Sequence, residues 1–309
     1  MEQMRGRVIR STGSWYEVKT ESGEIFRARL RGKFKQDKLK VNNPIAVGDW
    51  VLLDQEGEEG SAVIKTIEPR TNYIIRKSTR KSNFSHIIAS NLDQALLVAT
   101  LAFPRTSLGF IDRFLVSAES FRIPCVIVIN KSDLLDQEGL EVVAQLKELY
   151  EGIGYRTLLI SVLEEQGLDE IKAVLKGKTS LISGHSGVGK SSLLNALVPE
   201  LGLRIGEVST FANKGTHTTT FAEMFETEGD ARIIDTPGIK ELGLVEMEQE
   251  EISDYFPEMR AFLGQCKFNN CLHVNEPGCA VLEAFVNGEI ADSRYMSYLS
   301  MLEDSDNRR

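Results

Sequence analysis

The chain has 309 residues, of which 42% are hydrophobic and 26% charged, as in ordinary globular proteins of two or three domains. No apolar stretch is long enough to span a membrane and the N-terminus has no apolar secretion signal, so we expect a cytoplasmic protein. Residues 1–81 carry 17 Lys and Arg against 11 Asp and Glu, although the whole chain has a net charge of −9. A basic front fits a polyanionic partner, but a solvated surface without any partner explains the charge equally well.

Residues 1–70 show short strand patterns separated by glycine and polar turns. The strand-like segments are 5–10, 15–18, 24–30, 49–53 and 62–67, the last two with imperfect alternation. Several short strands in a small region suggest an all-β closed barrel, and an OB-fold is the type we expect. The basic run 31–40 would be an exposed loop of this barrel, and residues 71–87 have the composition of a linker.

From residue 88 to residue 245 the pattern changes to buried strands that alternate with helices. Strands are predicted over 95–99, 125–129, 158–160, 181–183, 221–225 and 231–234, with helices over 140–150 and 192–197. Nearly continuous apolar strands are typical of a parallel sheet covered on both faces, so we predict a doubly wound α/β domain. Residues 246–309 lack strand patterns, and helices are expected over 280–286 and 293–302.

A phosphate-binding loop follows the predicted strand 181–183. Its sequence matches G-x-x-x-x-G-K-S, in which backbone N–H groups converge on phosphates and the helix N-terminus adds positive charge. Lys190 would reach the β- and γ-phosphates and assist catalysis there, and Ser191 would coordinate Mg²⁺. The predicted nucleotide contacts of this loop are Gly184, Ser186, Gly187, Val188, Gly189, Lys190, Ser191 and Ser192.

The sequence Asn130-Lys131-Ser132-Asp133 follows the strand 125–129 and is the guanine-reading signature of GTP-binding proteins. The Asp133 carboxylate would accept the two adjacent N–H groups of guanine, a pattern that adenine lacks. Lys131 would lie along the base, and Asn130 would tie neighbouring loops together. Ser161, after the strand 158–160, would contact the guanine oxygen through its backbone. The alternative is a simple helix-capping cluster.

Asp235-Thr236-Pro237-Gly238 ends another apolar strand. Behind a phosphate loop, Asp235 could hold the Mg²⁺ shell, and the Gly238 N–H could sense the γ-phosphate. A threonine-rich segment lies between the phosphate loop and Asp235, and either Thr218 or Thr219 could supply a Mg²⁺ ligand; spacing does not choose between them.

Ile239 follows this motif, where many GTPases carry a glutamine that orients the attacking water. An isoleucine cannot polarise water, so we take His217 as the candidate catalytic residue. The alternative is a loop histidine with a packing role.

Four potential metal ligands lie close together near the C-terminus: Cys266, Cys271, His273 and Cys279. Their spacing is C-x4-C-x-H-x5-C, and three thiolates with one imidazole suit a closed tetrahedral Zn²⁺ site of structural type. The fourth cysteine, Cys125, lies on a predicted strand and fits a buried apolar position instead.

The order of the motifs is inverted, because the guanine-reading motif precedes the phosphate loop. This order resembles the circularly permuted GTPases, and the chain resembles the ribosome small-subunit-dependent GTPase A family from end to end. Segments that carry the resemblance are 89–94, 111–114, 187–192, 217–220, 278–281, Arg294-Tyr295 and Tyr298. Val162 departs from it, because the family usually has alanine there.

The resemblance implies an N-terminal OB-fold that binds RNA, a circularly permuted GTPase core and a C-terminal helical zinc-binding domain. It implies GTP or GDP, Mg²⁺ and one structural Zn²⁺ as cofactors, with the small ribosomal subunit and its rRNA as partners of a monomer. GTP hydrolysis, slow alone and stimulated by that subunit, would serve late subunit maturation and the release of the protein. Two other readings remain: an RNA-binding module with GTP as a conformational ligand, and a metabolic or tRNA-modifying phosphate-loop enzyme.

Overall fold

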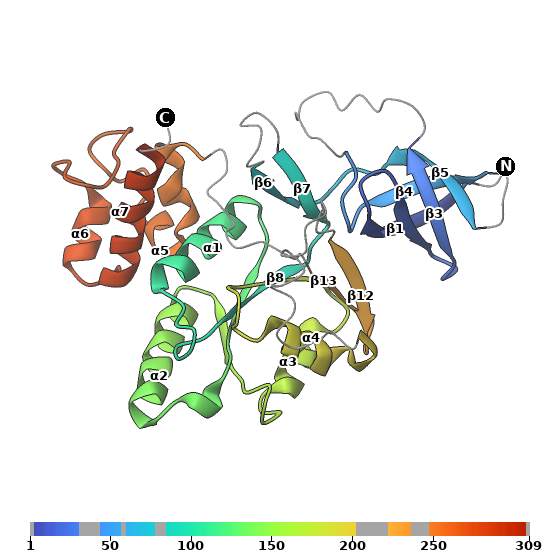
Figure 1. The fold of residues 1–309 in the computed structure, drawn as a ribbon. Coiled ribbons are helices and arrows are strands. Elements are labelled where there is room, and N and C mark those ends of the chain that lie inside the picture. The colour runs from blue at the N-terminus through green and yellow to red at the C-terminus, as the bar shows by residue number, and fades with distance from the viewer. Residues whose placement is uncertain are drawn as a thin grey trace, which may run out of the picture.

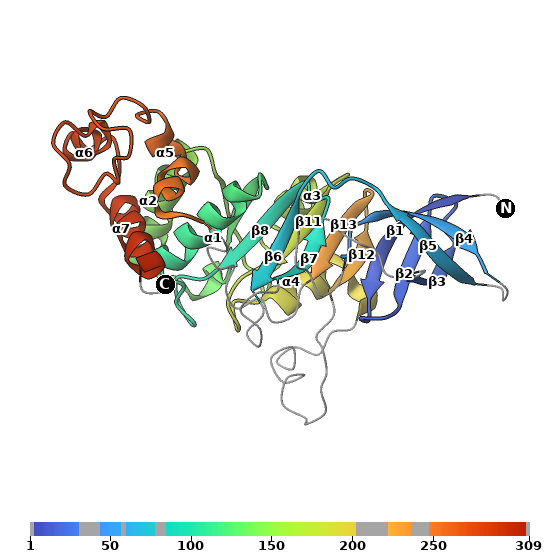
Figure 2. The same ribbon diagram turned by 90° about the horizontal axis from the view of Figure 1, so that it is seen from above.

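The computed structural model describes residues 3–30, 44–56, 60–77, 85–201, 222–235 and 247–306. The molecule is elongated, with a β-barrel at one end, a sheet flanked by helices in the middle and a small helical module at the other end (Figures 1 and 2). Among the helices of these ranges, none has both the length and the apolar character needed to cross a membrane.

The N-terminal module is a closed five-stranded barrel. Its strands are β1 (Met4–Ser11), β2 (Tyr16–Thr20), β3 (Ile25–Leu30), β4 (Trp50–Gln55) and β5 (Ser61–Ile67). They pair in the order β1-β2-β3-β5-β4, and β4 closes the barrel by pairing with β1. Alternate side chains, such as Tyr16 and Val18 of β2, fill the interior, as the alternating pattern requires. The predicted barrel is therefore confirmed.

The segment 71–87 is not the plain linker that its composition suggested. Strands β6 (Tyr73–Lys77) and β7 (Ser85–Ser90) pair as an antiparallel two-stranded sheet. Ile74 and Ala89 are fully buried, and Val47 bridges to Ala89 from the barrel side. The segment therefore includes paired strands, which its polar and basic composition did not indicate.

The middle module is the predicted doubly wound sheet. Its parallel strands are β8 (Gln94–Ala99), β9 (Cys125–Ile129), β10 (Arg156–Leu159), β11 (Thr179–Ser183) and β13 (Ala231–Asp235), in the order β10-β9-β8-β11-β13. Strand β12 (Glu223–Thr227) is antiparallel to β13. Helices α1 (Leu108–Ser120) and α2 (Gln137–Gly152) contribute to one hydrophobic cluster, and α3 (Leu168–Leu175) and α4 (Lys190–Leu197) to another. Alternate residues of β8 enter the two clusters, so one lies on each face of the sheet.

The barrel and the middle module share one continuous sheet. Strand β1 pairs antiparallel with β12 through Arg10 and Glu223, which makes a single sheet of 11 strands. The buried Arg7 side chain of β1 also donates to Thr179 Oγ1 (2.9 Å) and to the carbonyl of Asn91 (3.0 Å). Burial lowers the pKa of Arg7 to about 10, which leaves the side chain charged near neutral pH. The barrel is therefore attached to the middle module at β12, at the start of β11 and at Asn91, which precedes β8.

The C-terminal module contains short helices arranged around α7. Its elements are the 3-10 segment Gln249–Tyr255, α5 (Pro257–Arg260), α6 (Ala280–Val286) and α7 (Asp292–Asp306). Two further single 3-10 turns, Ser132–Leu134 and Pro199–Leu201, lie in the middle module. Helices α6 and α7 confirm the two predicted C-terminal helices.

A buried ion-pair network fixes the C-terminal module to the middle one. Arg294 of α7 donates to Asp112 of α1 and to Glu258 of α5, both at 2.6 Å, and Tyr150 of α2 donates to Asp112 at 2.9 Å. Arg294 and Asp112 are fully buried, and Glu258 is nearly so. Burial opposes the charge of Arg294, but the carboxylates of Asp112 and Glu258 raise its pKa overall. The same two residues, Asp112 and Arg294, belong to segments that carried the family resemblance.

We expect Arg294→Ala to destabilise the C-terminal module by about 3–5 kcal/mol, because the buried carboxylates of Asp112 and Glu258 lose the guanidinium that pairs with both. The matched control is Arg260→Ala, which breaks a partly exposed pair with Glu119 and should cost less than about 1 kcal/mol. Native-state hydrogen exchange of the α7 amides measures both effects. Equal losses in the two variants would contradict this account.

Candidate nucleotide and zinc sites

The phosphate-binding loop connects β11 to α4 at the carboxyl edge of the sheet. Gly184 has φ +145°, and a Cβ there would lie 2.1 Å from the carbonyl oxygen of Val98. Gly189 has φ +98°, and a Cβ there would lie 2.3 Å from Asn130 Nδ2. These two glycines let the loop pack against the neighbouring strand ends. Val188 is fully buried between them, whereas Ser186 and Gly187 are exposed at the loop tip.

Lys190 lies over its own loop. Its Nζ donates to the carbonyl of Gly184 at 2.6 Å and to that of His185. Burial lowers the pKa of Lys190, and the charge of Asp235 acts in the opposite direction. Asp235 ends β13, which runs parallel to β11 with Asp235 opposite Ile182. The charge of the carboxylate therefore acts on the ammonium at this edge of the sheet, an arrangement that phosphate and Mg²⁺ binding would use.

Asn130 joins three segments of the site. Its backbone N–H donates to Ala99 at the end of β8, and its Nδ2 donates to the Val188 carbonyl of the phosphate loop at 2.9 Å. Its Oδ1 accepts the Val162 N–H at 3.2 Å. The expectation that Asn130 ties neighbouring loops together agrees with these bonds. The residue brings the two motifs, far apart in the chain, to one place.

Lys131 and Asp133 are held by different neighbours. Lys131 has a left-handed backbone, φ +66°, and its Nζ donates to the Phe103 carbonyl at 2.6 Å. Asp133 Oδ1 accepts the Ser161 hydroxyl at 2.5 Å. The other carboxylate oxygen and the remaining lone pairs of Asp133 would accept the N–H groups of a base.

Ser161 contributes differently from the expectation. Its backbone N–H donates to the carbonyl of Gln166 at 3.1 Å, so it is not available to a guanine oxygen in this arrangement. Its hydroxyl instead orients Asp133 and accepts the Glu164 N–H at 3.1 Å. The structure places Ser161 behind the carboxylate that would read the base.

Two contacts of the site had no signal in the sequence. The carbonyl of Phe103 holds the Lys131 ammonium, and the ring of Phe110 stacks on His185 of the phosphate loop with centroids 3.7 Å apart. Both come from the turn and helix after β8, a region without a known motif. Ser191 and Ser192 lie half-buried in the first turn of α4. The expected contacts His217, Thr218, Thr219 and Gly238 lie outside the described residues.

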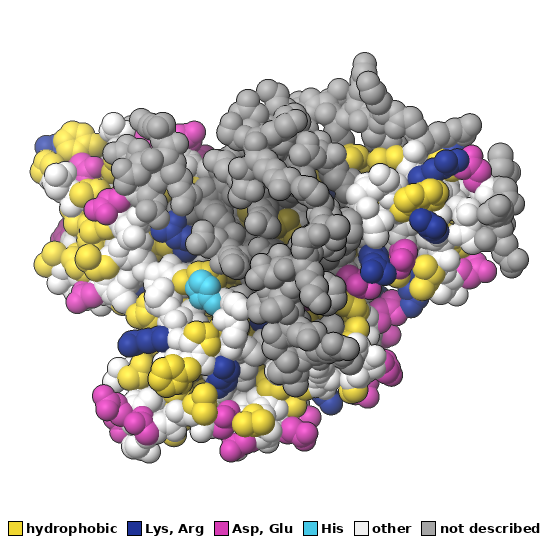
Figure 3. All heavy atoms as spheres, viewed as in Figure 1, with side chains coloured by type: hydrophobic (Ala, Val, Ile, Leu, Met, Phe, Trp, Pro, Cys, Tyr) yellow, Lys and Arg dark blue, Asp and Glu magenta, His cyan; other side chains and the backbone are white. Residues whose placement is uncertain are grey.

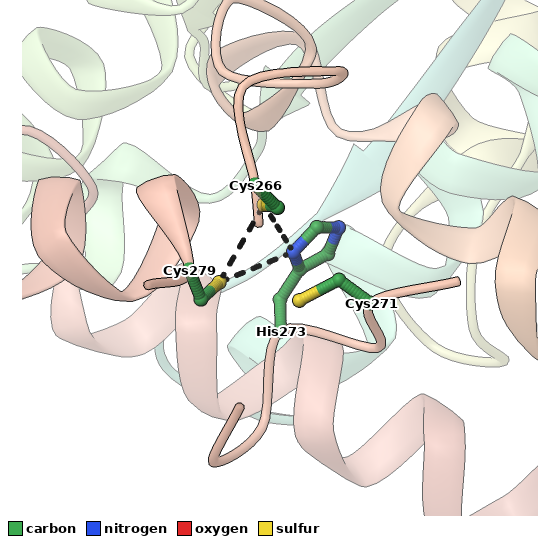
Figure 4. A group of neighbouring side chains, drawn as sticks. All are labelled: Cys266, Cys271, His273 and Cys279. Carbon is green, nitrogen blue, oxygen red and sulfur yellow. Dashed lines mark hydrogen bonds between the residues drawn. The ribbon is translucent and has the colours of Figure 1, made fainter. Parts of the chain in front are cut away.

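The four predicted zinc ligands come together in the C-terminal module (Figure 4). Their ligand atoms all lie within 4.8 Å of one another. The Sγ atoms of Cys266 and Cys279 are 3.8 Å apart, and His273 Nδ1 lies 3.6 and 3.3 Å from them. Zn–S bonds of about 2.3 Å at a tetrahedral centre place sulfur atoms roughly 3.8 Å apart, so this set fits one Zn²⁺.

The surroundings of the cluster favour neutral imidazole and a fixed loop. Burial lowers the pKa of His273, which keeps the imidazole in the form that binds metal. The hydroxyl of Tyr295 donates to the carbonyl of His273 (2.7 Å), and that of Tyr298 to the carbonyl of Leu272 (2.6 Å). Helix α7 therefore contacts the zinc-ligand loop through Tyr295 and Tyr298, and it contacts α1 through Arg294.

Because the ligand loop is packed on α7, we expect removal of zinc to disorder both. A strong chelator should release about one equivalent of zinc per chain and expose the α7 amides to hydrogen exchange. Cys271→Ser should behave as the chelated protein does, whereas Cys125→Ser, remote from the cluster, should retain its zinc. Full protection of α7 after complete loss of zinc would show that the metal is not structural.

Comparisons with known proteins agree with this geometry. The model of the RsgA GTPase family matches residues 67–245, and that of the RsgA N-terminal domain matches residues 5–64. The small ribosomal subunit biogenesis GTPase RsgA of Cytophaga hutchinsonii is 53% identical over 99% of this chain and 100% of its own length. That of Bacteroides fragilis is 52% identical over 98% and 97%.

Two solved structures share the whole architecture. YjeQ from Thermotoga maritima has a TM-score of 0.82 and 38% identity, with all of both chains covered. YloQ, described as a circularly permuted GTPase, has a TM-score of 0.78 and 33% identity over 100% of this chain and 96% of its own. The family matches, the identities over nearly the full chain and the permuted order of the site lead to one conclusion: this chain belongs to the RsgA family of circularly permuted GTPases.

Proposed function

We propose that this protein is a GTPase that binds the small ribosomal subunit and couples GTP hydrolysis to late maturation of the subunit and to its own release. The relatives named as small ribosomal subunit biogenesis GTPases support the biological role. The bond from Asn130 to Val188 carries the chemical part, because it unites the guanine-reading motif with the phosphate loop. A site with both halves can select and hold a guanine nucleotide.

The proposed roles of the residues follow from their positions. Lys190 would exchange its loop carbonyls for the β- and γ-phosphates, with the N–H groups of residues 184–192 around the chain of phosphates. Bound Mg²⁺ would neutralise phosphate charge, and Ser191, Asp235 and Thr219 or Thr218 are its proposed ligands. Asp133, oriented by Ser161, would select guanine.

The barrel is the proposed contact with rRNA. Many of its described basic side chains are paired with acidic ones, such as Arg5 with Glu68 and Lys65 with Asp54. Figure 3 shows both basic and acidic side chains over the barrel on the face in view. Arg27 instead lies over the Trp15 ring, 4.5 Å from its centroid. An aromatic ring and a guanidinium together suit stacking on bases beside a phosphate backbone. We propose that the protein acts as a monomer in the cytoplasm, where its ribosomal partner is found.

GTP turnover in the presence of ribosomal subunits tests this function. Isolated small subunits should accelerate hydrolysis strongly, whereas large subunits at the same concentration should not; partner-assisted gains reach about 10⁵ in other GTPases. Turnover that both subunits leave unchanged would favour an RNA-binding module in which GTP acts only as a conformational ligand.

We expect His217→Ala to reduce turnover while leaving GTP affinity unchanged, because the proposed role of His217 is to polarise water and not to hold the nucleotide. Single-turnover kinetics with separately measured GTP binding distinguish the two effects. Ser186→Ala, at the exposed tip of the phosphate loop, provides the contrasting variant. It keeps His217 and replaces a predicted nucleotide contact, so it should affect GTP affinity instead. Wild-type turnover in the His217 variant would remove the residue from the mechanism.

A further inference from the structure

The turn between β8 and α1, residues 100–107, contacts both halves of the nucleotide site. The Phe103 carbonyl accepts the bond from Lys131 Nζ at 2.6 Å. On the other side, a Cβ added to Gly187 of the phosphate loop would lie 3.3 Å from Pro104 Cδ. The turn therefore lies beside both the base-reading motif and the phosphate loop. A nucleotide that spans these two motifs would carry its sugar past this turn.

The turn is held in shape by buried threonines. The Thr106 N–H donates to the Thr100 carbonyl at 2.8 Å, and the Thr106 hydroxyl accepts the Thr100 N–H at 3.1 Å. The Thr100 hydroxyl donates to the Pro104 carbonyl. Thr100 and Thr106 are both almost fully buried, so these bonds are shielded from water. The backbone of this turn is already ordered. Binding of a ligand to a side chain on the turn would therefore cost little backbone conformational entropy.

Phe103 lies on this turn, and its ring is exposed to solvent. Its side chain is 84% exposed, the largest fraction among the exposed large apolar residues of the described chain. Next comes Leu163 at 82%, on the loop that holds Asp133 through Ser161. The two most exposed apolar side chains thus belong to the loops that contact Lys131 and Asp133. Exposed apolar groups beside convergent polar groups are typical of a ligand site.

We propose that Phe103 is a nucleoside-binding residue, whose ring packs on the sugar and the adjacent face of the guanine in both GTP and GDP. This inference rests on the proposed function, since it assumes that the nucleotide lies across Lys131 and the phosphate loop. The carbonyl of the same residue fixes the Lys131 ammonium, so Phe103 sets one wall of the pocket with its backbone and its side chain. The ring acts on the nucleoside and has no part in the transfer of the phosphoryl group.

Phe103→Ala should weaken the binding of GDP and of a non-hydrolysable GTP analogue by about 10-fold each, because an aromatic ring loses its apolar contact. The equal loss is the specific expectation, since a residue that contacts the γ-phosphate would affect the GTP analogue alone. Truncating a ring that is 84% exposed removes little packing, so the fold should be retained. Val286→Ala, 79% exposed on α6, is the matched control and should bind as the wild type does.

Phe103→Trp gives an independent readout. The two natural tryptophans, Trp15 and Trp50, lie in the barrel, so a change in the added emission on GDP binding reports contact at position 103. Wild-type affinities in Phe103→Ala together with unchanged emission in Phe103→Trp would overturn the inference while leaving the proposed function intact. Failure of the wild-type protein to bind guanine nucleotides would overturn both.

Discussion

The nucleotide site depends on the side chain of Asn130, which bonds at once to the phosphate loop and to the loop after β10. In this chain the guanine-reading motif and the phosphate loop follow separate strands, β9 and β11, with β8 between them in the sheet. Backbone pairing brings the strand ends to one edge, but it does not fix the loops relative to each other. The amide of Asn130 supplies one donor and one acceptor in the required directions, and the absence of a Cβ at Gly189 leaves room for it.

The neighbouring modules are attached to the core in two different ways. The barrel continues the sheet through β1 and β12, so its orientation is linked to the strand that precedes Asp235 in the chain. The zinc module is attached by buried charge, with Arg294 between carboxylates of α1 and α5. Such a network is costly to break and leaves little room for a free hinge at this interface. Helix α1 contacts both sides, because its Phe110 stacks on His185 of the phosphate loop and its Asp112 accepts a hydrogen bond from Arg294.

Sequence patterns predicted the parts of this molecule in which local chemistry determines structure. Nearly continuous apolar strands predicted the parallel sheet, and alternating residues predicted the barrel. The C-x4-C-x-H-x5-C spacing predicted a set of metal ligands, which the fold brings together. The hairpin of β6 and β7 was missed because its buried apolar residues, Ile74, Ile75, Ile87 and Ala89, lie in short runs beside polar and basic residues. The bond between Lys131 and Phe103 could not be predicted, since it joins a side chain to a backbone carbonyl 28 residues away and needs no particular residue there. The hydrogen bond of Ser161 could not be predicted for a similar reason. Its backbone N–H, expected to contact guanine, donates to the carbonyl of Gln166.

We infer that the guanine-reading motif and the phosphate loop, whose order in the chain is inverted, form one pocket that is selective for guanine. Isothermal titration of the purified protein with GDP and with ADP tests it directly. A carboxylate that accepts both N–H groups of guanine should favour GDP on the order of 10⁴-fold. Asp133→Asn, which replaces an acceptor with a donor, should transfer this preference to xanthosine diphosphate. Equal affinities of the wild-type protein for GDP and ADP, or no binding of either, would contradict the account.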